Sequence, residues 1–501
     1  MAKASQNSSP ISILYLLLFA TLPLIYVESV VDNTLIPRQL FSSVILLAVA
    51  GLLTRAKTDL KMKLGPVMLF FLFFLLMQVI SVTAAINVIE SWATITRYLV
   101  GFSFLVLTVF LLQSGQLKVG HLLRGVVIFG GLAAVVTLIK LGQLLNAGNF
   151  VEDIYSIKAN FGHKNLLSSA LMLSFPFAVM VAITDKNSLW NKSSLALAFL
   201  LVIEMFVLRT RGVWLAMFIA TAASLLCLWA VRKHGKVVVN FPWRWVGMGG
   251  VLALVILVGL FSTDGFKENI GDRTNLNRRL VFWENSWKMI QDHPVVGVGA
   301  GNWRINFPKY GLAPTEGAIA KARLDQSVYQ GITHIQRPHN DYLWVWSEAG
   351  PLALLCFLGI FATAIWQIFK NLRHFETKKE LATELMCLFG IVAYLCFSIT
   401  DFPLERTSHT LLVLTLVALP FRRIMPGPAL AFKSRNVVMA LVVLMLFSGV
   451  VCLYRYQGEI HTSEVLEANR SQNARKIVPA AEKAVNAFYN MGSLLQSPAL
   501  L

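Results

Sequence analysis

Long apolar stretches separated by short polar connections run through almost the whole chain. A helix needs about 20 apolar residues to cross the hydrocarbon core of a bilayer. Such stretches begin near residues 11, 36, 64, 95, 120, 164, 193, 212, 245, 343, 382, 408 and 436. The pattern predicts an all-α polytopic membrane protein with about 12–13 transmembrane helices. The first stretch, Ile11–Val27, could be a signal peptide, but no small-residue cleavage site follows it, so we interpret it as the first span.

Basic residues are concentrated in every second polar connection. They stand at 55–63, 118–124, 186–192, 232–244, 370–379 and 422–435, whereas the intervening connections are acidic or mixed. The positive-inside rule places the basic connections in the cytoplasm. We therefore expect a bacterial inner-membrane protein with a cytoplasmic N-terminus and a C-terminus on the outer, periplasmic side.

This topology divides the chain into two predicted parts. Residues 1–454 form a transmembrane domain, with one long periplasmic loop at 263–342 between spans 9 and 10. Residues 455–501 form a short periplasmic tail, in which Ile477, Ala480, Ala484 and Phe488 recur at helical spacing.

The composition agrees with a chain whose solvent is the bilayer. Of its 501 residues, 56% are hydrophobic and only 14% are charged. The net charge of +18 lies between apolar spans, so it indicates topology rather than a nucleic-acid partner. Five cysteines lie within or beside apolar runs without a CxxC pair, which favours neither a disulfide framework nor a zinc site.

Three short connections on the expected outer side carry cations, against the general pattern. They are residues 161–165 (FGHKN), 209–212 (RTRG) and 401–406 (DFPLER). A single lysine or arginine there is equally consistent with snorkelling to lipid headgroups. Several such segments on one face favour a function for the group.

The long loop contains a predicted helix and a glycine-rich segment. Asn277–Gln291 places two tryptophans on one helical face, which suits either an interfacial helix or packing onto the bundle, and His293-Pro294 ends it. Gly297–Asn302 (GVGAGN) superficially matches a dinucleotide fingerprint, but it follows a helix on the outer side, so we reject that interpretation. Tight turns explain the glycines, and anion binding by their amides is the alternative.

Histidine chemistry is expected where the loop meets the tenth span. His334, His339 and Asp341 could supply metal ligands, but their spacing matches no metal motif, and no metal is expected. A histidine at this boundary is better suited to act as a base near neutral pH. Cations nearby in the predicted topology, Arg211, Arg279 and Lys164, suit a diphosphate.

Three ordered motifs resemble those of the superfamily of O-antigen ligases and O-antigen polymerases, which includes related protein O-oligosaccharyltransferases. They are Arg211–Ala216 (RGVWLA), Arg279–Trp283 (RLVFW) running on to His293–Gly299 (HPVVGVG), and His339–Leu343 (HNDYL). The resemblance covers roughly residues 160 to 420. It implies a GT-C-like, inverting glycosyltransferase that needs no nucleotide sugar, metal or other cofactor.

The resemblance also implies roles for individual residues. His339 matches the family's catalytic histidine, and Arg211 and Arg279 match the arginines that hold the departing diphosphate. Possible further donor-site residues are Lys164, Asn165, Arg278 and Arg337, with Glu405 and Arg406 as weaker candidates. The donor would be an undecaprenyl-diphosphate-linked glycan, and the acceptor a hydroxyl of lipid A-core, of another glycan or of a protein.

Three alternatives remain open at this point. A polymerase would use the same base and cations with a growing glycan as acceptor, and a protein O-oligosaccharyltransferase would use a protein hydroxyl. A polysaccharide transporter or flippase also needs many spans, but it places ionisable residues near the midplane, often within internal repeats. We find no repeat, and Lys140 is the one possible midplane charge.

Overall fold

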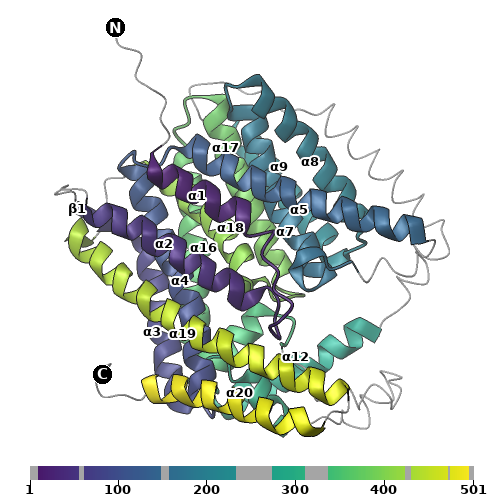
Figure 1. The fold of residues 1–501 in the computed structure, drawn as a ribbon. Coiled ribbons are helices and arrows are strands. Elements are labelled where there is room, and N and C mark those ends of the chain that lie inside the picture. Colours follow the sequence, from purple (N-terminus) through teal and green to yellow (C-terminus); the bar gives the residue numbers. More distant parts are fainter. Residues whose placement is uncertain are drawn as a thin grey trace.

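The computed structural model describes residues 9–55, 61–147, 157–232, 274–310, 337–423, 430–471 and 474–495. Two short strands and fifteen α-helices occur in these ranges (Figure 1). The elements are α1 (Pro10–Thr21), α2 (Leu35–Arg55), β1 (Lys61–Leu64), α3 (Pro66–Ser81), α4 (Val88–Gln113), α5 (Val119–Ala147), α7 (Lys164–Thr184), α8 (Ser188–Val207), α9 (Arg211–Val231), α12 (Thr274–Asp292), α13 (Trp303–Asn306), α16 (Asp341–Leu372), α17 (Lys378–Phe397), α18 (Thr407–Ala418), β2 (Leu430–Lys433), α19 (Ser434–Arg470) and α20 (Ala474–Leu495). Short 3₁₀ turns lie at Val82–Ala84, Ala159–Phe161, Phe307–Tyr310, Pro403–Glu405 and Leu419–Phe421.

The predicted all-α membrane fold is confirmed. Ten helices of the described chain are long and apolar enough to cross a membrane, and two shorter apolar helices, α1 and Thr407–Phe421, accompany them. Each predicted span has a helix beginning within seven residues of its expected start, except the span near residue 245, which lies outside the described residues.

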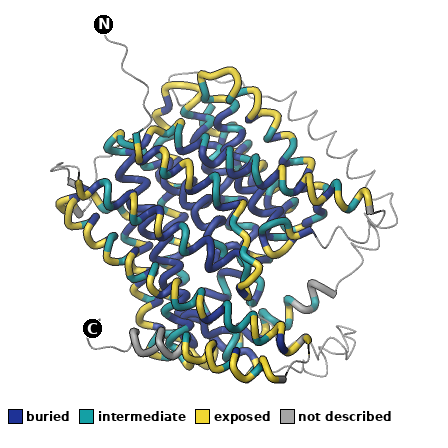
Figure 2. The backbone as a smooth tube through the Cα atoms, in the orientation of Figure 1, coloured by how far each residue is buried: buried dark blue, intermediate teal, exposed yellow. Residues whose placement is uncertain are grey.

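The bundle has a buried centre and a lipid-facing rim. The membrane window of α4 is completely buried, because α2, α3, α18 and α19 pack around it. By contrast, only 28% of the membrane windows of α8 and α9 is buried, as expected for helices in contact with lipid. Figure 2 shows this gradient from the dark centre outward.

At one end of the bundle, the basic connections contact one another or the residues beside them. Arg124 donates to both carboxylate oxygens of Asp185 at 2.8 Å. Strands β1 and β2 pair antiparallel, with Lys61 opposite Lys433. Arg422 pairs with Glu384 at 2.5 Å.

The other end collects the acidic and mixed connections. Asp32 pairs with Arg406 at 2.8 Å, and Asn165 contacts Asp401 at 3.0 Å. The contacts therefore sort the connections into the same two groups as the charge pattern does. The end with Asp401 is called the site end below.

Helix α19 extends beyond the bundle at the site end. It runs without a break from Ser434 to Arg470, across residue 454, and α20 folds back along it (Figure 1). The amphipathic α20 buries Ala480 and Ala484. The division of the chain at residue 454 stays a prediction.

Candidate active site

Three long helices begin at the site end: α7 at Lys164, α9 at Arg211 and α16 at Asp341. The N-terminus of each helix carries a partial positive charge. Helix α17 packs against both α7 and α9, and the segment after its C-terminus, residues 398–406, reaches the start of α16. This arrangement is suited to binding an anion.

His339 stands in the turn that precedes α16. Its backbone has a positive φ of 53°, a conformation that non-glycine residues rarely adopt outside functional or tightly constrained positions. The turn is held from both sides. The Asn340 side chain caps α16 by accepting from the Leu343 N–H at 3.0 Å, and the Trp283 indole donates to the Pro338 carbonyl at 3.1 Å.

Aromatic rings fix the imidazole of His339 in place. The Phe282 ring is stacked on it with centroids 6.1 Å apart, and the Phe402 ring meets it edge-on at 4.8 Å. The imidazole Nδ1 lies 3.6 Å from the Asp401 Oδ1 atom. This contact leaves Nε2 as the nitrogen available for a substrate.

Asp401 connects the histidine to two further side chains. Its carboxylate accepts from the Asn165 amide at 3.0 Å and lies 4.0 Å from the Arg279 guanidinium. Burial raises the pKa of this carboxyl, but the charges of His339 and Arg279 and the hydrogen bond from Asn165 outweigh burial and bring the pKa to about 2. Asp401 is therefore ionised near neutral pH.

A close helix contact brings Arg211 to the same place. A Cβ atom on Gly212 would lie only 2.9 Å from the Thr400 hydroxyl, next to Asp401 in the chain. The glycine therefore allows the start of α9 to approach the end of α17. Arg211 is exposed there, and Lys164 is close enough to both Arg209 and Arg211 for their charges to repel one another.

Arg209 also has a positive φ, of 51°, in the turn between α8 and α9. The Trp214 indole closes this turn by donating to the Met205 carbonyl at 3.0 Å. The RGVWLA motif thus contributes a close-approach glycine and an anchoring tryptophan around the exposed Arg211.

The glycine-rich segment is structural. Gly297, Gly299 and Gly301 all have positive φ, and a Cβ on any of them would come within 2.7 Å of an atom of another segment of the protein. The amides of Gly301 and Trp303 do bind an anion, but it is the buried carboxylate of Glu348, at 2.7 and 2.9 Å. The tight turns expected from the glycines are therefore present, and the two amides bind a side chain of the protein itself.

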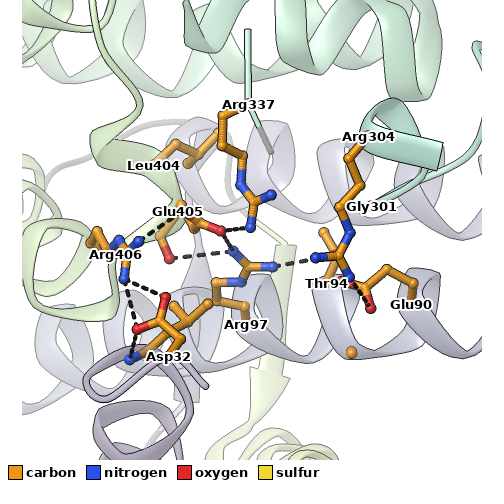
Figure 3. Close-up of polar contacts among 12 residues, drawn as sticks. Asp32, Glu90, Thr94, Arg97, Gly301, Arg304, Arg337, Leu404, Glu405 and Arg406 are labelled. Atoms are coloured by element: carbon orange, nitrogen blue, oxygen red, sulfur yellow. Dashed lines mark hydrogen bonds and ion pairs between the residues drawn. The ribbon is translucent and has the colours of Figure 1, made fainter. Parts of the chain in front are cut away.

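A buried ionic network lies behind the histidine turn (Figure 3). Glu405 pairs with Arg97 at 3.6 Å, with Arg406 at 3.3 Å and with Arg337, which also lies over the Trp344 ring. Arg406 in turn reaches Asp32. Because Arg337 precedes His339 by two residues, the network anchors the chain that enters the site.

The structure brings together His339, Asn165 and Arg279 around Asp401, and the packing of Gly212 on Thr400 brings the start of α9 close to them. Arg337 faces Glu405 instead, so its described contacts are structural. The Arg278 side chain and all of His334 lie outside the described residues. No group of three or more histidine, cysteine or acidic side chains able to hold a metal occurs in the described ranges.

Helix α12 matches the predicted loop helix, ending at Asp292 just before His293-Pro294. It packs on the bundle through Met289 and Ile290, whereas Leu280 and Trp287 remain about half exposed. Of the two predicted alternatives, an interfacial helix or packing onto the bundle, packing is therefore observed for the face with Met289 and Ile290. Lys140 is exposed, contacts Gln143 at 3.2 Å and lies in the last third of α5, towards the site end.

Comparison with known proteins finds two kinds of similarity, to a family model and to curated proteins. Residues 196–358 match the family model described as O-antigen ligase. The chain is 26% identical to an O-antigen ligase of Salmonella typhimurium over 222 residues, which are 41% of this chain and 47% of that protein. It is 22% identical to the teichuronic acid biosynthesis protein TuaE of Bacillus subtilis over 252 residues, 48% of this chain and 46% of that protein.

The chain thus spans about half the length of the curated relatives it matches. The resemblance drawn from the three motifs is confirmed, and the chain is a multi-pass membrane protein with an O-antigen ligase-like domain.

Proposed function

We propose that this protein is an inner-membrane glycosyltransferase that transfers a glycan from undecaprenyl diphosphate to a hydroxyl of lipid A-core at the periplasmic face. The observation that carries the proposal is the Asp401 carboxylate, which lies beside His339, Asn165 and Arg279 at the site end. That end lacks the basic connections, and the positive-inside rule therefore favours its periplasmic location.

The chemistry requires a base on one side of the anomeric carbon and cations on the other. His339 takes the proton of the acceptor hydroxyl through Nε2, the acceptor oxygen bonds to the anomeric carbon, and the bond from that carbon to the diphosphate oxygen breaks. Attack opposite the leaving group inverts the anomeric configuration. Asp401 stabilises the imidazolium that forms, as the buried carboxylate does in a catalytic triad.

The departing undecaprenyl diphosphate gains negative charge as the bond breaks. Arg211, Arg279 and Lys164 are the cations placed to stabilise it, and the N-termini of α7 and α9 add their partial charges. A bound diphosphate would also relieve the repulsion between Lys164, Arg209 and Arg211. This mechanism uses no metal or other cofactor.

Transfer to a growing glycan is the second candidate. It uses the same base and cations, and the similarity to TuaE, whose name refers to teichuronic acid biosynthesis, supports it. In cells, a deletion that shortens the polysaccharide indicates a polymerase, whereas a deletion that leaves full-length but unattached polysaccharide indicates a ligase.

The proposal is tested with purified protein, an undecaprenyl-diphosphate-linked O-antigen and lipid A-core, without added metal. We expect His339→Ala and Asp401→Asn to reduce release of undecaprenyl diphosphate by about 10²- to 10⁴-fold, the range for loss of a general base. Leu280→Ala, on the exposed face of α12, is the control and should retain activity. Near-normal transfer by His339→Ala would refute the mechanism.

A further inference from the structure

A pocket of about 410 Å³, lined by both charged and apolar side chains, lies at the site end, between the bundle and the extension of α19. Its lining residues are Val31, Asn87, Ile89, Glu90, Arg304, Arg455, Glu459 and Thr462. They come from four parts of the chain: the connection after α1, the start of α4, helix α13 of the long loop, and the part of α19 beyond residue 454. Its volume lies within the usual range of small-molecule sites.

The charges that line this pocket neutralise one another. Glu90 pairs with Arg304 at 2.9 Å and also with Arg455, and Arg455 contacts Glu459 at 3.3 Å. Two guanidinium groups therefore face two carboxylates. A ligand with a strong net charge of either sign would have to break these pairs, at a considerable cost for groups that are partly buried.

An uncharged ligand with many hydroxyl groups meets no such cost. A guanidinium carries five N–H donors and a carboxylate has several lone pairs, so paired groups retain capacity for further hydrogen bonds. Hydrogen bonds to charged groups are stronger than those between neutral groups. The Thr462 hydroxyl and the Asn87 side chain add polar atoms, while Val31 and Ile89 give small apolar surfaces that suit the C–H faces of a sugar ring.

The pocket is connected to the histidine turn through the ionic network. Thr94 lies one helical turn beyond Glu90 on α4 and accepts from Arg97 at 3.2 Å. Arg97 then pairs with Glu405, which pairs with Arg337 before His339. Figure 3 shows the Glu90–Arg304 pair on one side of Arg97 and the Glu405 cluster on the other.

We propose that this pocket is a subsite for neutral sugar residues of the acceptor, and that the extension of α19 supplies one wall of it. The proposal rests on the glycosyltransferase function proposed above and assigns to the tail a part in acceptor recognition. A sugar held there would lie beside the ionic network that anchors the histidine turn.

The test obstructs the pocket from two sides without touching its ion pairs. Thr462→Phe fills it from α19, and Val31→Trp fills it from the opposite wall. Leu466→Phe, about one helical turn beyond Thr462, is exposed and does not line the pocket, so it is the matched control. Thermal unfolding verifies that each variant folds.

Two measurements are made on the full chain in nanodiscs. Binding of core oligosaccharide, released from the lipid by mild acid, is followed by saturation-transfer NMR, and transfer is followed at increasing lipid A-core. We expect both obstructing variants to weaken binding and to raise KM for lipid A-core about tenfold or more, equivalent to about 1.4 kcal/mol, with kcat little changed. Leu466→Phe should match the wild type in both measurements.

The outcomes separate this subsite from the proposed function. Wild-type binding and KM in both obstructed variants, or no binding of core oligosaccharide by the wild type, overturns the subsite. Full transfer by His339→Ala overturns the function instead. Tighter binding of phosphorylated than of neutral core oligosaccharide, lost on Arg455→Gln, would overturn the preference for uncharged sugars.

Discussion

The carboxylate of Asp401 is buried, with only 2% of its side chain exposed, yet three polar side chains surround it. Burying a charge without partners costs several kcal/mol, so this arrangement is stable only while its partners remain in place. One buried acid thus links the proposed base to a cation proposed to hold the leaving group.

The ionisation of Asp401 makes stability depend on pH. Its pKa falls from the ordinary 3.8 to about 2 in the folded protein, so its stabilising contribution is complete above about pH 4 and is lost as the pH falls towards 2. A shift of this size corresponds to about 2 kcal/mol. We expect the unfolding temperature to fall more between pH 5 and pH 3 in the wild type than in Asp401→Asn, as measured by scanning fluorimetry. Equal decreases would contradict this account.

The central residues of the site could be inferred from the sequence only in part. His339, Arg211 and Arg279 stand in recognisable motifs, so their types and spacing indicated chemistry. Asp401 was visible only as one member of a polar connection, because its partners lie 62 or more residues away in the chain. Arg97 was missed, although a basic residue inside an apolar span is itself a signal of function or of a buried pair.

Close approaches between elements depend on glycine at particular points. Gly350 has a positive φ of 82° within α16, and a Cβ atom there would lie 1.9 Å from the Val295 carbonyl oxygen. This contact seats the HPVVGVG segment on α16, just before the amides that bind Glu348.

We expect Gly350→Ala to destabilise the fold by about 2 kcal/mol or more, because both the backbone conformation and the contact oppose a side chain. Gly51→Ala is the control, since nothing lies within 4 Å of a Cβ at that helical position. Thermal unfolding of the two variants in the same detergent measures the difference. An unchanged unfolding temperature for Gly350→Ala would show that the segment can shift without cost.

The elements themselves were more predictable than their contacts. Apolar length is a local property, so the helices of the membrane bundle began where the hydropathy pattern placed them. The pairing of β1 with β2 was not foreseen, because each strand has only four residues and its partner lies in a connection about 370 residues away. The path of α19 through residue 454 was likewise hidden, since polar and apolar helices join there without a break.

At the scale of the whole molecule, the two ends differ in charge and in contacts. This difference gives a direct test of the proposed orientation. In a variant without its five native cysteines, Glu464→Cys at the site end should react with a membrane-impermeant maleimide in intact spheroplasts. Lys378→Cys, exposed at the opposite end, should react only after the membrane is opened. The reverse pattern would invert the topology and place the candidate site in the cytoplasm.

The small sheet of β1 and β2 bears on how the chain is assembled during synthesis. Strand β1 leaves the ribosome hundreds of residues before β2. Its backbone N–H and C=O groups therefore cannot form their hydrogen bonds with β2 while the intervening spans are inserted. An unpaired strand edge readily pairs with the wrong segment, and the two lysines of β1 discourage this. The pairing is completed only when the connection to α19 is made, so the last long membrane helix is fastened to the connection that leads into α3.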